Sequence, residues 1–133
     1  MSSLNAFLHP VQIENKEVIV SNRFKEDGKP VPFVIRPITE KENGLLIKKY
    51  TKKDRNGRDV LDRTEYAHAL VACAVVFPDL TDSDLQKKYN VLGETALLTE
   101  MLNVGEYALL SQKVSEISGL NGDINKDIDE VKN

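Results

Sequence analysis

The stretch from Thr64 to Leu80 constrains the fold of this chain more than any other segment. Within it, all twelve residues from Tyr66 to Phe77 are apolar except His68. This is a helical length rather than a strand length, and the alanines in the run are strong helix formers. A helix that is apolar on all sides must be covered nearly all round, and this one is too short to cross a bilayer. The run therefore predicts a buried core helix that Pro78 stops at Phe77.

The same residues predict the start and the surroundings of this helix. Asp62 or Thr64 can cap it, and with Asp62 as the cap, Glu65 stands at the capping-box position. Cys73 is the only cysteine, and we expect an inert buried thiol of the kind usual in a reducing cytosol. The residues expected at the centre of the core are Leu70, Val71, Ala74 and Phe77.

Two segments before the helix predict a small antiparallel hairpin. Lys16–Asn22 contains three consecutive β-branched residues, and Val31–Ile38 alternates apolar with other positions. The pair Asp27-Gly28 between them is a strong signal for a hairpin turn. Prolines at positions 30, 32 and 37 remove donors from the ladder, which predicts that the second strand lies at an edge of the sheet.

Capping signals and apolar spacing predict further helices. Thr39 and Glu42 form a capping box, and Thr81 can cap a short helix over residues 82–89. A helix from residue 94 is separated by Gly105 from a last helix, which Gly119 ends. The predicted fold class is therefore α+β: a small antiparallel β-hairpin packed on a bundle of about five helices.

One domain is expected over residues 1–120, followed by a polar, flexible tail over residues 121–133. At the start of the domain, residues 1–14 are expected to be irregular, with Phe7 and Leu8 tucked into the core. In the tail, Ile124, Ile128 and Val131 have the spacing of a short amphipathic helix. No signal peptide or membrane-spanning run is recognisable, which favours the cytoplasm.

Charge is distributed unevenly along the chain. Residues 1–66 carry 13 Lys and Arg against 10 Asp and Glu, whereas residues 67–133 carry 5 against 11. Much of the positive charge lies in one short segment, which can be a solvated loop or a site for an acidic partner. This basic patch consists of Lys48, Lys49, Lys52, Lys53, Arg55 and Arg58.

The sequence holds no recognisable arrangement of catalytic or metal-binding residues. His9 and His68 are far apart, and together with one cysteine they give no metal-ligand spacing. Neither a phosphate-binding glycine motif nor a nucleophile elbow occurs. We therefore expect no enzyme activity, no metal and no cofactor.

DNA binding is the alternative function that we considered. Residues 82–102 have the apolar spacing of a helix-turn-helix regulator. Its recognition helix would carry Glu94 and Glu100 into the groove, without a Lys or Arg to meet the phosphates. A protein-interaction module is therefore favoured, and a nucleic-acid partner is not expected.

A series of short segments points to one kind of interaction module. The segments are L-N-A-F-L at 4–8, E-D-G-K-P-V-P-F at 26–33, I-R-P-I-T-E at 35–40, V-V-F-P-D-L at 75–80, D-L-Q at 84–86, M-L-N-V-G-E-Y at 101–107 and E-I-S-G at 116–119. In their order and spacing, the chain resembles the XkdN-like family of phage tail assembly chaperones, found in tailed phages and prophages of Gram-positive bacteria. The resemblance implies non-enzymatic work during virion assembly in the cytoplasm of the bacterial host.

The resemblance also implies partners. Such chaperones are thought to bind the tape measure protein and to recruit tail tube subunits. The family often makes a longer product by ribosomal frameshifting, and Val131-Lys132-Asn133 can be encoded by a slippery heptamer. We also expect weak self-association, because the apolar stripe of residues 97, 98, 101 and 102 is wider than one core contact needs.

Two interpretations of the partner-binding surface remain open. A groove between the helix at 94–102 and the helix at 106–118 can hold the tape measure protein, because methionine and leucine adapt to varied apolar partners. The same side chains can instead close the core, and the basic patch is then a secondary site. The anchors of the predicted groove are Leu98, Met101, Leu102, Tyr107 and Leu110.

Overall fold

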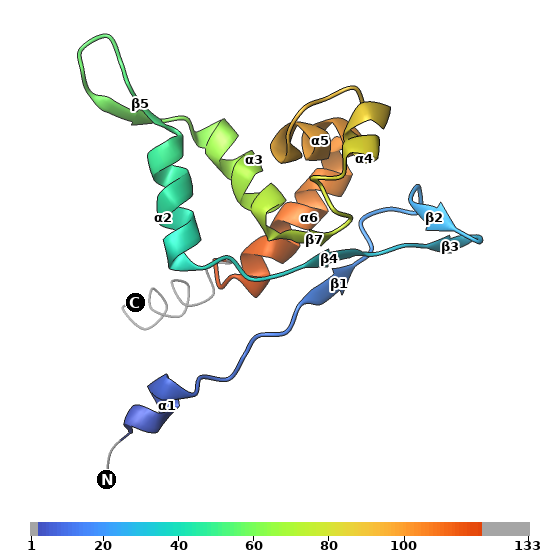
Figure 1. Ribbon diagram of the computed structural model, residues 1–133, viewed down its shortest axis with the longest axis horizontal. Coiled ribbons are helices and arrows are strands. Elements are labelled where there is room, and N and C mark those ends of the chain that lie inside the picture. Colours follow the sequence, from blue (N-terminus) through green and yellow to red (C-terminus); the bar gives the residue numbers. More distant parts are fainter. Residues whose placement is uncertain (1–2, 121–133) are drawn as a thin grey trace, which may run out of the picture.

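The computed structural model of the protein describes residues 3–120 and confirms the α+β class (Figure 1). The helices in this range are α1 (Leu4–Leu8), α2 (Glu40–Lys49), α3 (Arg63–Ala74), α4 (Ser83–Lys88), α5 (Glu94–Met101) and α6 (Val104–Ile117). The strands are β1 (Lys16–Val18), β2 (Lys25–Glu26), β3 (Lys29–Pro30), β4 (Phe33–Ile35), β5 (Thr51–Lys53), β6 (Asp59–Leu61) and β7 (Val75–Phe77). The amphipathic spacing predicted for residues 124–131 lies outside the described residues.

The main sheet has three antiparallel strands in the order β1-β4-β7. Val18 stands opposite Phe33 on one side of β4, and Phe77 stands opposite Val34 on the other. The prediction that the second hairpin strand lies at an edge is therefore wrong, because β4 is central. Val34 and Ile35 are the residues of β4 that pair on both sides, and Pro32 and Pro37 lie outside them, so these prolines remove no ladder donor there.

The third strand comes from the predicted core helix. Helix α3 ends at Ala74, and Val75–Phe77 continues the same apolar run as β7. The predicted helical end at Phe77 is therefore wrong. β-Branched Val75 and Val76 and aromatic Phe77 favour a strand, and β4 offers them a pairing edge. As a result, Phe77 is 50% exposed rather than central, and Leu70 is only half-buried.

Two further hairpins project from the body of the molecule. Strands β2 and β3 pair across Asp27 and Gly28, which both have positive φ, so the predicted Asp-Gly turn is confirmed. The basic segment, predicted as a loop, is a second hairpin in which Lys53 of β5 stands opposite Asp59 of β6. The pairing within this segment was not predicted, because charged residues have low strand propensity.

The N-terminal segment does not tuck into the core. Residues 4–8 form α1, and residues 10–15 lead from it to β1 without regular structure. Phe7 is 80% exposed and Leu8 is also exposed, so their predicted burial is wrong. Figure 1 shows α1 standing away from the body at the end of this segment.

The core lies between the main sheet and helices α3, α5 and α6. Val71 and Ala74 are buried in it, as predicted. Strand β4 sends Phe33 and Ile35 inward, while Val34 between them is only half-buried. The largest fully buried side chains are Ile35, Leu97, Leu98, Leu110 and Val114.

Helix ends follow the capping chemistry closely. The capping box of Thr39 and Glu42 starts α2, and Asp62 caps α3. Two predictions shift by a residue or two: Asp82 rather than Thr81 caps α4, and α6 begins at Val104, so that the predicted separator, residue 105, lies in its first turn.

At the other end of α6, Gly119 has φ +77°, which confirms the predicted C-cap. Its N–H donates to the carbonyl of Glu116, and the N–H of Leu120 donates to the carbonyl of Ser115, the Schellman pattern.

Candidate functional site: a groove over helix α3

One face of helix α3 forms the floor of an open groove. Glu65, His68, Ala69, Ala72 and Cys73 recur at the spacing that places residues on one side of a helix. They line two recesses of about 790 and 420 Å³. The alanine side chains of this face are short, so the backbone of another segment can approach α3 closely.

The two recesses adjoin because they share their walls. Lys49 and Tyr50, at the end of α2, line both recesses on one side. Thr81, Glu94 and Thr95, around the start of α5, line both on the other. Together they make one continuous groove between α2 and α5, which we call the α3 groove.

The lining of the α3 groove is mixed in character. Leu92 stands on its rim with 91% of its surface exposed, whereas Glu65, Lys49 and Glu94 add charges of both signs. An amphipathic helix with an apolar stripe and polar flanks matches such a lining. The groove therefore combines an exposed apolar side chain with charges of both signs.

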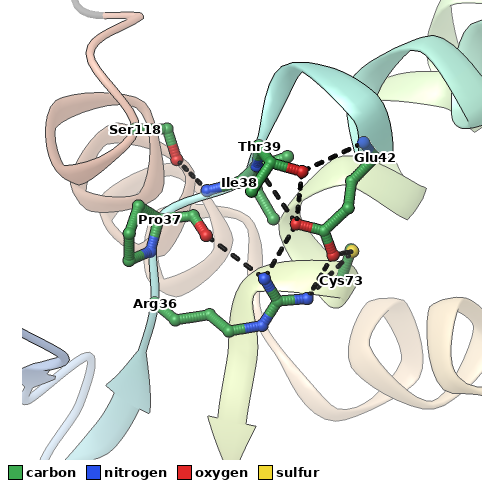
Figure 2. Close-up of polar contacts among 7 residues, drawn as sticks. All are labelled: Arg36, Pro37, Ile38, Thr39, Glu42, Cys73 and Ser118. Carbon is green, nitrogen blue, oxygen red and sulfur yellow. Dashed lines mark hydrogen bonds and ion pairs between the residues drawn. The ribbon is translucent and has the colours of Figure 1, made fainter. Parts of the chain in front are cut away.

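A polar cluster fixes α2, one wall of the groove, to the rest of the fold (Figure 2). Arg36, directly after β4, donates two parallel hydrogen bonds to Glu42, at 2.9 Å from Nη1 to Oε1 and 2.6 Å from Nη2 to Oε2. The Sγ atom of Cys73 on α3 lies 3.5 Å from both partners. Planar two-point contacts of this kind are specific in geometry, so the cluster orients α2 against α3 and the sheet.

The charges in this cluster are strongly coupled. The hydrogen bonds from Arg36 are the main reason that the pKa of Glu42 is lowered to about 2. Burial is the main reason that the pKa of the Cys73 thiol is raised, and the neighbouring Glu42 carboxylate adds to the effect. The raised pKa favours the protonated thiol, and Cys73 is half-buried rather than buried as expected.

A second ion pair ties the loop after β1 to α5 and α6. Arg23 donates to Glu106 from Nε at 2.8 Å and from Nη2 at 2.5 Å, and also from Nη2 to the Met101 carbonyl at 3.0 Å. Glu106 accepts the backbone N–H of Asn103 at 2.7 Å, as in a capping box. The hydrogen bonds from Arg23 lower the pKa of the buried Glu106 to about 2.

Neither the Arg36–Glu42 pair nor the Arg23–Glu106 pair was predicted from the sequence. The Asn103–Glu106 spacing was a readable signal for the cap, but nothing in the sequence linked it to Arg23, 83 positions away. Both pairs nevertheless fall near segments that carry the family resemblance, since Arg36 is in I-R-P-I-T-E and Glu106 is in M-L-N-V-G-E-Y.

The predicted groove between α5 and α6 is filled by its own side chains. Met101 is 5% exposed, and Tyr107 is half-buried with its ring 5.1 Å from that of His68 in an edge-to-face contact. Burial raises the pKa of Tyr107 to about 12. In this conformation these residues close the core, and only Tyr107 offers surface to a partner. The fully enclosed anchors are Leu98, Leu102 and Leu110.

The same burial removes the reason given for self-association. Leu97 and Leu98, expected to be surplus apolar surface, are completely buried in the core, where α5 packs on α3. The residues of the basic patch, in contrast, are all exposed on the end of α2 and on the β5–β6 hairpin. Lys53 pairs with Asp59 at 2.7 Å across that hairpin.

Two further features bear on the class of the protein. Within residues 3–120, no group of three or more His, Cys, Asp or Glu residues is arranged to hold a metal ion. Among the helices described here, none is long and apolar enough to cross a membrane. The described part of the chain is thus a small helical scaffold that carries a groove of mixed lining.

Comparisons with known proteins identify the family of this chain. The model of the phage XkdN-like tail assembly chaperone family matches residues 4–132. The phage-like element PBSX protein XkdN of Bacillus subtilis (strain 168) is 29% identical over 129 residues, which is 92% of this chain and 87% of that protein. The crystal structure of the protein YqbN superposes with a TM-score of 0.73 and 28% identity over 86% of this chain and 94% of that one.

The chain belongs to the XkdN-like family of phage tail assembly chaperones. The resemblance found from short segments of the sequence is thereby confirmed. The helix-turn-helix alternative finds no support in the exposed side of α5, where Glu94, Thr99 and Glu100 face solvent without a Lys or Arg.

Proposed function

We propose that the protein is a non-enzymatic chaperone that binds a helix of the tape measure protein in the α3 groove and helps to recruit tail tube subunits. This work would take place in the cytoplasm of the bacterial host. The observation that supports the proposal is the groove itself, which is open, continuous and floored by the small side chains of α3.

The physical need for such a chaperone follows from the expected partner. A long helical protein that waits for its tube exposes apolar stripes, and exposed apolar patches of that size promote aggregation. A groove of mixed lining can cover an apolar stripe while its charged rim meets the polar flanks. The hydrogen bonds between Arg36 and Glu42 hold α2 against the segment after β4. Because α2 is one wall of the groove, these bonds help to keep the walls apart.

Capture of co-expressed tape measure protein tests the groove. Leu92→Asp should weaken capture strongly, because it replaces the exposed apolar side chain on the rim of the groove with a charge, while the unfolding temperature stays unchanged. Val104→Asp is the matched control, since Val104 is 89% exposed but does not line the groove, and it should leave capture intact. Equal capture by all three proteins would reject the α3 groove as the binding surface.

Capture of tail tube subunits by the complex of the chaperone with the tape measure protein, but not by the chaperone alone, would support the recruiting role. A frameshift-extended form of the chain would be a further component of the same complex.

A further inference from the structure

A second apolar surface lies at the end of strand β7, beside the α3 groove. Phe77, the last residue of β7, is 50% exposed, and Pro78 follows it. Both residues line two recesses of about 210 and 480 Å³, which adjoin because they also share Leu85 of α4. We call the two recesses together the Pro78 cleft. Asp79 is the only residue that lines both this cleft and the α3 groove, so the two surfaces can be occupied separately.

The smaller recess of the Pro78 cleft has an aromatic lining. Phe24 and Phe33 line it and meet edge to face, with ring centroids 5.8 Å apart. Tyr89, directly after α4, lines it too. The backbone N–H of Val31 donates to the carbonyl of Phe24 at 2.7 Å, which holds the base of the β2–β3 hairpin beside the recess. Aromatic recesses of this kind accept a large apolar side chain of a partner.

The larger recess adds negative charge to this apolar lining. Asp79, Asp82 and Asp84 line it, against Lys88 alone. Asp84 stands in the first turn of α4 and is exposed, so its carboxylate can meet a partner. An occupant that carries Lys or Arg is therefore complementary in charge to this part of the cleft.

The arrangement of the two recesses favours an extended occupant. In an extended segment, residues i and i+2 point to the same side and lie about 6.6 Å apart. One apolar and one basic side chain from such a segment can therefore enter the two adjoining recesses together. The apolar recess of about 210 Å³ has room for a single large anchor rather than for the stripe of a helix.

We propose that the Pro78 cleft binds an extended segment of a partner protein, in which a large apolar residue lies two or three positions from a Lys or Arg. The apolar side chain enters the smaller recess beside Phe24 and Phe77, and the basic side chain meets Asp82 and Asp84. The proposal does not rest on binding in the α3 groove, because different residues carry it. A chain with both surfaces can hold two partners at once.

Fluorescence anisotropy of labelled synthetic peptides with the full chain tests the proposal. The probe is a short peptide in which a Phe-Pro core is followed by a pair of lysines. One control peptide has glutamates in place of the lysines, and the other has serine in place of the phenylalanine. At low salt, each control should bind at least about tenfold more weakly than the probe, because it loses the charge match or the apolar anchor.

Two matched pairs of variants locate the binding. Asp84→Lys should weaken the probe at least about fivefold and strengthen the glutamate peptide, because it reverses a charge in the cleft. Glu100→Lys makes the same change at an exposed site outside the cleft and should do neither. Phe77→Ala should weaken the probe about tenfold. Val76→Ala, at a residue of the same strand that is 44% exposed and outside the lining, should bind like the wild type.

Several outcomes would overturn the proposal. They are a wild type that does not bind the probe, equal binding of the three peptides, and wild-type affinity in the Asp84→Lys variant. Probe binding that is lost as the protein concentration rises would assign the cleft to a second copy of the chain instead. Binding only after removal of residues 121–133 would assign it to that segment.

Discussion

Glu42 and Glu106 each perform two tasks with one carboxylate. Glu42 accepts the backbone N–H of Thr39 at the start of α2 while it pairs with Arg36. Glu106 does the same for Asn103 and Arg23 at the start of α6. Each therefore combines a helix cap with a long-range connection, so its loss affects a helix terminus and a tertiary contact together.

This pairing predicts a dependence of stability on pH. The pKa of each carboxyl falls from 4.5 to about 2 on folding. A pKa that is lower in the folded state stabilises the fold fully above the unfolded value, and the contribution is lost as pH falls through the folded value. The free energy of unfolding should therefore decrease between pH of about 4.5 and about 2. Urea denaturation across this range should show a smaller decrease in the free energy of unfolding for the double variant Glu42→Gln/Glu106→Gln than for the wild type. An identical decrease in the two proteins would contradict the role given to these two carboxylates.

The burial of Met101 predicts what happens when its side chain is charged. Met101→Glu should lower the free energy of unfolding by about 3 kcal/mol, because it places an unpaired charge in the core. Val104→Glu, at a site that is 89% exposed, should have almost no effect. Thermal melts followed by circular dichroism compare the two. An unchanged melting temperature for Met101→Glu would show that Met101 is not a core residue and would support the prediction that it contacts a partner.

At the scale of elements, local signals were readable in the sequence and long-range ones were not. The Thr39–Glu42 capping box, the Asp27-Gly28 turn and Gly119 at a helix end depend on neighbours within four positions, and each was predicted. The division of the apolar run between α3 and β7 was not predicted, because it depends on pairing with β4, which lies about 40 positions earlier in the sequence. The side chains of β7 suit either structure, and pairing selects the strand.

The same limit applies to the candidate site. Apolar spacing on α5 showed correctly that one side of the helix is covered, but it could not show that the cover is the molecule's own core, including α3. The α3 groove depends on α2 and α5 standing on either side of one helical face, which periodicity within a single helix does not reveal. The basic patch was identified from composition alone, because exposed charge needs no tertiary information.

The β5–β6 hairpin allows a prediction about one element. Charge reversal at Lys52 and Arg58 should leave the unfolding temperature unchanged, because both side chains are exposed. It should weaken capture of the co-expressed tape measure protein at low salt, and the difference from the wild type should shrink as salt is added, since exposed charges are screened. Capture at two salt concentrations measures this. A salt-independent loss would indicate that the hairpin contributes packing rather than charge.

At the scale of the whole molecule, the N-terminal segment and the body should be separable. Deletion of residues 1–14 should leave the unfolding temperature of the protein nearly unchanged, because Phe7 and Val11 lie outside the core. Calorimetry of the full chain and of the shortened chain measures the difference. A large loss of thermal stability would show that the N-terminal segment belongs to the folding unit.

The central position of β4 also bears on the order in which the chain can acquire its structure during synthesis. Strands β1 and β4 leave the ribosome close together, but β7 emerges about 40 residues later, directly behind α3. Until then one edge of β4 stays unpaired, and bringing distant segments together is the slow part of folding. The prolines at 32 and 37 confine that edge to the four residues between them, which limits mispairing with other nascent chains while the sheet waits for its last strand.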